Sequence, residues 1–337
     1  MPEEKRPRIP RGLKPDGPAL WSYGFRPFFL GAAVWAVLTM ALWMAALIHG
    51  LPLGGDFGAP LWHAHEMVFG FASAVLAGFL LTAIPNWTGN LPVSGRALVL
   101  LFALWALGRG AMAGAVWLGL WPAALLEAAF LPVLLAIAGR EIVSGRKWND
   151  LKVLGGVAAI TLGNLGFHGA VLFAGDPALW LRAAVAGYVM LVLIIGGRII
   201  PSFTRNWLHQ QGKGPMPVPY NRFDMAVIVI SALTLAAWTL APEARLTPLA
   251  ALLAAGLNAA RLVRWQGLLT LPEALLAVLH LAYACVPLGF AGMAAAGAGV
   301  VQPVTALHVM TVGVIGLTML AMMTRVTRGH TGRALTA

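Results

Sequence analysis

Residues 62–89 read WHAHEMVFGFASAVLAGFLLTAIPNWTG, and this stretch decides what kind of protein the chain is. Its segment 67–84 contains no charged residue and is followed by a proline and a glycine. A helix of about 20 apolar residues crosses a hydrocarbon core about 30 Å thick and satisfies its own backbone hydrogen bonds there. The stretch therefore predicts a membrane-spanning helix, and His63, His65 and Glu66 lie at its beginning.

The rest of the chain has the same apolar character. Of the 337 residues, 59% are hydrophobic and only 10% are charged, whereas a soluble domain carries about 25% charged residues. Ten apolar stretches are long enough to cross a bilayer. They lie at about 28–48, 65–84, 97–113, 118–138, 151–172, 179–200, 223–241, 246–262, 272–295 and 303–324. The sequence therefore predicts an all-α fold, a polytopic transmembrane bundle of about ten helices.

Basic residues are distributed unevenly along these spans. If the N-terminus is cytoplasmic, all but three of the 23 Lys and Arg residues fall on the cytoplasmic side. The exceptions are Arg109, Arg182 and Arg245. Cytoplasmic loops of membrane proteins are typically rich in Lys and Arg, so both termini are expected in the cytoplasm. The chain then divides into a basic arm (1–27), a transmembrane domain (28–324) and a cytoplasmic tail (325–337). The first span is expected to be retained, because no small-residue cleavage site follows it.

The net charge of +11 does not require a nucleic-acid partner. Basic residues beside helix ends contact anionic lipid headgroups, and each contributes roughly 1 kcal/mol near the membrane surface. We therefore expect membrane lipids, and no nucleic acid, as partners of these side chains. The single cysteine, Cys285, excludes an internal disulfide and a Cys-x-x-Cys site.

Six of the eight histidines lie within or beside the predicted spans, and four of them lie on different spans. These four are His65, His168, His280 and His308. All but His280, which is close to mid-depth, are expected in the outer half of the membrane. Ionisable groups at such depths usually face the bundle interior, and imidazole is a common ligand of haem iron and of copper. The histidines therefore predict a haem or copper site between helices, with interhelical hydrogen bonding as the structural alternative.

His63 is a further candidate metal ligand. It lies two residues before His65, so the two side chains point in nearly opposite directions if both are on one helix. They can share one ion only if His63 precedes the helix, which Pro60 allows. Otherwise His63 is an interfacial residue beside Trp62.

Two glutamates and an arginine also lie within the spans. Glu66 is placed to accept a hydrogen bond from an imidazole, as ligating histidines usually require, or to stabilise the start of its helix. Glu127 lies near the middle of its span, where a bare charge costs about 2.5–3.5 kcal/mol, so it is expected to be protonated or paired. Both glutamates are candidates for a proton path. Arg109 is expected to pair with Glu66 or with haem propionates, or to extend to the membrane rim. Asn164 and His168 share one helix face.

Several motifs resemble those of the NnrS family of bacterial membrane proteins, and they follow one another in the family's order along nearly the whole chain. The matching stretches are YGFRPFF (23–29), WHAHEMVFGFASAVLAGFLLTAIPNWTG (62–89), LWALGRG (104–110), GRIIPSFT (197–204), LHLAYACVPLG (279–289) and ALHVMTVGVIGLTMLAMMTRVTRGHTGR (306–333). The family's recurrent motifs contain His63, His65, Glu66, Arg109, His280, His308 and His330.

The resemblance implies haem of the b type and copper as cofactors, a location in the bacterial inner membrane, and a role in the response to nitric oxide. Our leading hypothesis is that the four histidines on different spans, with Arg109, hold the haem or copper and that nitric oxide binds at the metal. Electrons would come from an unidentified donor. The alternative is a transporter of metal or haem that uses the same histidines transiently. The sequence shows no pair of broken helices and no inverted repeat that would favour it.

The chain departs from the family pattern at its C-terminal end. Members of the family resemble twelve-helix proteins, whereas this chain ends four residues after GHTGR (329–333). The last pair of helices is therefore expected to be missing, while every span that carries a histidine is expected to be present.

Overall fold

The computed structural model describes residues 18–212 and 214–332. The described part contains ten helical spans long and apolar enough to cross a membrane, and it contains no strand. Five spans are single helices: α1 (Phe25–His49), α4 (Gly95–Ala113), α11 (Arg222–Leu240), α12 (Leu246–Val263) and α13 (Ala274–Gly297). Two combine short and long helices: α6 (Leu120–Ala128) with α7 (Phe130–Ser144), and η4 (Trp148–Asp150) with α8 (Leu151–Leu172). The predicted all-α transmembrane bundle of about ten helices is confirmed.

The remaining three spans, the second, sixth and tenth, each contain a π-helical segment between two α-helices. They are α2, η3 and α3 (Ala59–His65, Glu66–Phe71, Ala72–Thr88), α9, η5 and α10 (Ala178–Leu191, Val192–Gly196, Gly197–Gln211), and α14, η7 and α15 (Pro303–His308, Val309–Gly316, Leu317–His330). Short helices outside the spans are η1 (Ala19–Trp21), η2 (Gly55–Phe57), α5 (Ala115–Leu118) and η6 (Gly267–Thr270).

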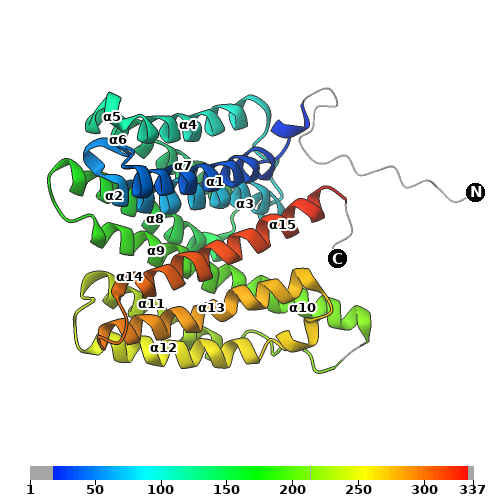
Figure 1. Ribbon diagram of the computed structural model, residues 1–337. Coiled ribbons are helices and arrows are strands. Elements are labelled where there is room, and N and C mark those ends of the chain that lie inside the picture. The colour runs from blue at the N-terminus through cyan, green and yellow to red at the C-terminus, as the bar shows by residue number, and fades with distance from the viewer. Residues whose placement is uncertain (1–17, 213, 333–337) are drawn as a thin grey trace, which may run out of the picture.

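The three π-containing spans meet at the middle of the molecule. α9 contacts both η3 and η7, and α15 contacts α3. In Figure 1 the spans before α9 form one half of the bundle, α11 to α13 form the other, and α9 and α15 lie between them. π-Helical turns inside α-helices are rare, and those that occur frequently lie at functional sites. This junction is therefore a candidate functional region.

Two helices continue beyond the apolar stretches that predicted them. α10 runs to Gln211 rather than to residue 200, and α15 runs to His330, inside the predicted tail of 325–337. The added turns carry mostly polar, exposed or half-exposed side chains. Hydropathy marks where a helix leaves the apolar core, but the helix can continue into the polar interface. Residues 1–17 of the predicted arm and 333–337 of the predicted tail lie outside the described residues.

The first and last spans begin and end at the same face of the bundle. The ring of His330 lies 5.7 Å from that of Phe25 and 5.9 Å from that of Tyr23. An even number of spans requires this arrangement. That this face is cytoplasmic remains a prediction from the distribution of Lys and Arg.

A buried polar cluster holds the second half of the bundle together. Arg261, fully buried on α12, donates to Asp224 of α11 (Nε to Oδ1, 3.0 Å) and to the carbonyl of Leu193 in η5 (3.1 Å). It also lies 3.1 Å from the hydroxyl of Tyr283 on α13, which in turn donates to Asn258 (3.0 Å). The cluster therefore joins four spans through one guanidinium that the sequence showed only as a basic residue near a helix end.

Close packing between α8 and α9 depends on glycine. A Cβ atom on Gly163 would lie 2.9 Å from the Cβ of Ala184 and 3.0 Å from the carbonyl oxygen of Trp180. Small residues at such contacts let two membrane helices approach closely. The contact matters for function because α8 also carries Asn164 and His168.

We expect Gly163→Leu to destabilise the protein by about 1–3 kcal/mol or more, since overpacking forces the two helices apart. Gly155→Leu, on the same helix, is the matched control because nothing lies within 4 Å of the added Cβ atom. Thermal unfolding of the two variants in detergent measures the difference. Equal midpoints would contradict the proposed packing.

Candidate metal centre

Six polar side chains from four spans meet in the first half of the bundle. We call them the buried network, and they are His65, Glu66, Arg109, Glu127, Asn164 and His168. His65 ends α2 and Glu66 begins η3, while α4, α6 and α8 contribute the other four. All six are buried. The network lies about one quarter of the way along the second span, at the start of its π-helical segment.

Glu127 is the centre of the network. Its Oε2 atom lies 2.7 Å from Nε2 of His168 and 3.3 Å from Nε2 of His65, and it accepts a hydrogen bond from Asn164 (2.9 Å). Its Oε1 atom accepts a hydrogen bond from Arg109. The expectation that Glu127 is paired is therefore confirmed. One carboxylate joins both imidazoles to the arginine.

Glu66 orients His65 from the other side. Its Oε1 atom lies 2.9 Å from Nδ1 of His65, and its Oε2 atom accepts hydrogen bonds from Arg109 (2.7 Å) and from the indole of Trp35 (2.8 Å). The expected contacts of Glu66 with an imidazole and with Arg109 are thus both present. Arg109 bridges the two glutamates and fixes the separation between them.

Local sequence explains how the helices admit this cluster. A Cβ atom on Gly70, one turn after Glu66, would lie 2.6 Å from Arg109 and 2.8 Å from the Glu66 carboxylate, so only glycine leaves room for the ion pair. On α8, Asn164 and His168 are four residues apart and therefore lie on one face. Both contact Glu127, as their spacing indicates.

The buried network contains one more carboxylate than guanidinium, so one negative charge needs a further positive partner. Glu66 and Glu127 bring two carboxylates, and Arg109 brings one guanidinium. Buried charges are tolerated only when they are paired. Both ring nitrogens of His65 also face oxygen atoms: Nδ1 faces Glu66, and Nε2 faces Glu127 and Asn164 Oδ1 (3.2 Å). A neutral imidazole carries only one proton, so the second position is filled by a proton or by a metal ion.

Three atoms of the network form a donor set for such an ion. Nε2 of His65, a carboxylate oxygen of Glu127 and Nε2 of His168 can be grouped within 4.8 Å of one another. Two imidazoles and one carboxylate with open positions are typical of non-haem iron, and imidazole also suits copper and zinc. The Glu66 contact to Nδ1 of His65 is the hydrogen bond that commonly fixes a ligating histidine. The donor set therefore fits a transition metal ion.

The same geometry leaves no room for a haem between these two imidazoles. Their ring centroids are 4.9 Å apart, and the Glu127 carboxylate contacts the Nε2 atoms of both. The ring of Phe167 lies 5.0 Å from that of His65, and the ring of Phe57 lies 5.8 Å from that of His168. These aromatic rings exclude water from the network, and a flat macrocycle does not fit inside it.

The other predicted ligands lie elsewhere. His63 stacks on Trp43 (centroids 4.8 Å apart) and contributes no atom to the network, in agreement with the opposite directions expected of residues two apart. His280 faces the Leu276 carbonyl (3.0 Å, Nδ1) and Thr204 (3.3 Å, Nε2). His308 is exposed, and its Nδ1 atom faces the carbonyl of Val304 (2.8 Å). Of the four histidines on different spans, the structure brings only His65 and His168 together.

Two residues of the site were not identified from the sequence. Trp35 looked like one of many aromatic residues in an apolar span, and nothing in its spacing indicates the bond to Glu66. Gly70 is recognisable in retrospect, because a glycine four residues after a buried glutamate lies on the same helix face.

Three comparisons with known proteins were informative to different degrees. Comparison with curated proteins and with solved structures found no match. The family model described as NnrS protein matches residues 19–337, which include all six residues of the buried network. Because the match covers nearly the whole chain, the protein belongs to the NnrS family.

Proposed function

We propose that the protein is a bacterial inner-membrane protein that binds a transition metal ion, copper or iron, at the buried network and uses it to bind nitric oxide. The observation that supports this most directly is the donor set of His65 Nε2, a Glu127 carboxylate oxygen and His168 Nε2, which lies in a buried network where two carboxylates share one guanidinium. Membership of the NnrS family supports the connection with nitric oxide.

The side chains of the network have distinct roles in this proposal. His65, Glu127 and His168 hold the metal, which supplies an open coordination position for a diatomic ligand. Glu66 fixes the orientation of His65, and Arg109 keeps both carboxylates charged and in place. The buried rings of Phe57, Phe167 and Phe69, the last 5.1 Å from the ring of His65, keep water out, which strengthens these electrostatic interactions.

Glu66 and Glu127 are also the groups best placed to move a proton at the site. Glu66 lies 2.9 Å from Nδ1 of His65, a ring nitrogen that stays free when Nε2 holds the metal, so a proton can pass between this carboxylate and the ring while the metal is bound. Glu127 can exchange a proton with the two Nε2 atoms only in the metal-free network. Reduction of nitric oxide would in addition require an electron donor outside this chain. Binding of nitric oxide requires no electron donor. Binding is therefore the part of the proposed function that the geometry supports best.

The proposal is tested by titrating nitric oxide into anaerobic, purified protein whose metal content has been measured. We expect about one metal ion per chain at this site and a nitrosyl spectrum that saturates at the same stoichiometry. His168→Ala removes one of three ligands and is expected to lose both the metal ion and the nitrosyl spectrum. His49 is an exposed histidine outside the network, so His49→Ala is expected to keep both the metal ion and the spectrum. A nitrosyl signal that persists in His168→Ala would contradict the assignment.

Haem, implied by family resemblance, requires a different ligand. We propose His308, because its Nδ1 atom is held by the Val304 carbonyl and its ring is exposed. That arrangement leaves Nε2 as the ligating atom, as is usual for haem-binding histidines. His280 is similarly held on Nδ1, but its Nε2 atom already faces Thr204.

His308→Ala is therefore expected to reduce the haem content to background while leaving the metal ion at the buried network. A pyridine haemochrome assay and elemental analysis of the same sample measure the two quantities separately. Wild-type haem content in His308→Ala would contradict this ligand, and loss of both cofactors would contradict the separation of the two sites.

A further inference from the structure

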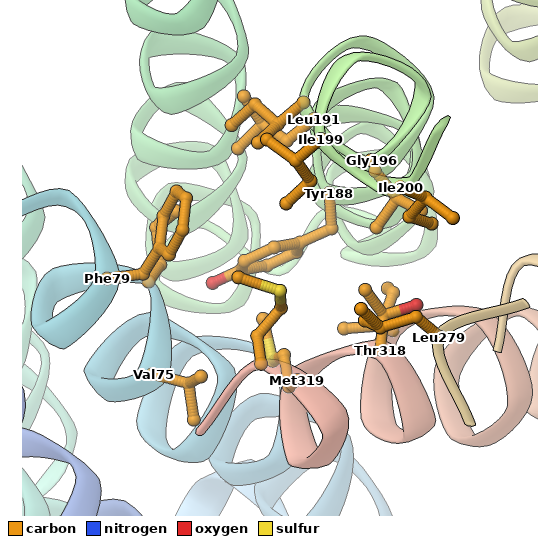
Figure 2. Close-up of a pocket in the computed structure, with 15 residues that line it drawn as sticks. Val75, Phe79, Tyr188, Leu191, Gly196, Ile199, Ile200, Leu279, Thr318 and Met319 are labelled. Carbon is orange, nitrogen blue, oxygen red and sulfur yellow. The ribbon is translucent and has the colours of Figure 1, made fainter. Parts of the chain in front are cut away.

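An apolar cleft lies where the three π-containing spans meet (Figure 2). Its cavity volume is about 80 Å³. Val75 and Phe79 of α3 form one wall, Tyr188 and Gly196 of the sixth span form the second, and Met319 of α15 forms part of the third. The cleft is thus built mainly from the second, sixth and tenth spans, near the midpoint of each, and Leu279 of α13 also lines it.

The lining of the cleft selects against charged and polar molecules. Nearly all the surface that the lining residues present to it is carbon or sulfur. The hydroxyl of Tyr188 is already engaged, since it donates a hydrogen bond to the carbonyl of Val68 (3.0 Å). The Thr318 hydroxyl also lines the cleft and has no hydrogen-bond partner among the described residues, but one hydroxyl without a charged neighbour does not hold an anion or a metal ion. Apolar cavities of this kind stay dry and bind apolar molecules such as xenon.

The cleft is open to the outside of the bundle. Phe79, Ile199, Met319 and Met322 line it and are only half-buried. Because these residues lie in the interior of membrane spans, the cleft faces the apolar core of the bilayer. A small uncharged molecule dissolved in the lipid can therefore reach it without crossing a polar surface.

Tyr188 connects the cleft to the buried network. Its ring lines the cleft, and its hydroxyl bonds to Val68, inside the π-helical segment that Glu66 begins. Tyr188, which is 2% exposed, therefore connects the cleft to the π-helical segment that begins at Glu66, and Figure 2 shows its ring within the cleft.

We propose that this cleft binds a small uncharged apolar molecule from the membrane and is its access site to the metal centre, with Tyr188 as the residue between the two. The identification of that molecule as nitric oxide rests on the proposed function. The cleft as a gas-binding site does not, because it follows from the lining, the opening and the position of Tyr188.

Xenon tests the cleft without any reference to nitric oxide. We expect xenon to bind there in the full-length protein, seen by ¹²⁹Xe exchange NMR or in crystals under xenon pressure. Gly196→Leu should lower xenon affinity at least tenfold, because a Cβ atom at Gly196 has ordinary contacts of 3.6 Å or more and the longer side chain fills the cleft. Gly155→Leu, which meets nothing within 4 Å, should bind xenon as the wild type does.

A second pair of variants tests the cleft independently, in case Gly196→Leu does not fold. Met319→Trp narrows the cleft from its half-buried rim, whereas Leu320→Trp changes a neighbouring side chain that is 55% exposed. We expect the first to weaken xenon binding and the second to leave it unchanged. Absence of xenon from the wild-type cleft, or equal binding in Gly196→Leu, Met319→Trp and wild type, would overturn the proposal.

Flash photolysis of bound nitric oxide then tests the access route. We expect the rate of recombination from solution to fall at least fivefold in Gly196→Leu and in Met319→Trp, with an unchanged nitrosyl spectrum, and to be normal in the two control variants. Unchanged rates in both cleft variants would overturn the route. If the metal centre binds no nitric oxide at all, the proposed function fails, and the xenon experiment alone decides whether the cleft binds gas.

Discussion

Replacement of Arg109 by methionine is expected to destabilise the metal-free protein by about 3–5 kcal/mol, the usual effect of removing one partner from a buried ion pair. Arg109 is 2% exposed, and its guanidinium bonds to Glu66 through one nitrogen and to Glu127 through another. Without it two carboxylates remain buried close together. Protein treated with a chelator is required, because a bound metal cation would compensate part of the lost charge.

Unfolding free energy in detergent measures this effect. Arg96→Met, which removes an exposed arginine at the start of the same helix, is expected to change stability by less than about 1 kcal/mol. Adding Glu66→Gln to Arg109→Met removes one of the two unpaired charges and should recover part of the loss. An Arg109→Met variant as stable as Arg96→Met would show that the network is not held together by this guanidinium.

The second large effect concerns the metal. We expect Glu127→Gln to weaken metal binding by roughly 100-fold or more, since even residues that only support a ligand are worth 10–100-fold. Glutamine preserves the size of the side chain and removes its charge, and Glu127 is the carboxylate that contacts both imidazoles. Titration against a chelator of known affinity measures the loss.

Two controls make the Glu127 result specific. His63→Ala removes a nearby imidazole that lies outside the donor set and is expected to leave affinity unchanged. Thermal unfolding of metal-free Glu127→Gln shows whether the variant is folded. Wild-type affinity in a folded Glu127→Gln protein would place the metal somewhere else.

Much of the fold followed from the sequence because membrane spans are set by length and polarity alone. Each predicted apolar stretch became a helical span, and the third and eighth, the shortest, are present as α4 and α12. The π-helical segments had no sequence signal that we recognised. They change the register of a helix by less than one turn, which hydropathy cannot resolve.

The site was predicted only in part, because the sequence does not specify how the helices are arranged around one another. Position along a helix gives the depth of a residue in the membrane but not its position in the plane. His65, His168 and His308 were all expected in the outer half, yet only the first two face the same interhelical space, whereas His308 is exposed. Contacts within one helix, such as the shared face of Asn164 and His168, were predictable because spacing fixes them.

Glu127 illustrates what the sequence could and could not supply. Its apolar surroundings indicated that the charge must be paired. Its partners, however, come from three other spans and lie up to 62 positions earlier and 41 positions later in the chain, and no local pattern connects them.

X-ray absorption spectroscopy of the purified, metal-loaded protein tests most directly whether a metal ion is held by His65, Glu127 and His168. The account predicts two imidazole nitrogens and at least one oxygen at about 2.0–2.2 Å from the metal. It further predicts that one imidazole is lost from the spectrum in His65→Ala and one in His168→Ala. A first coordination shell that is the same in wild type and in both variants would contradict the account.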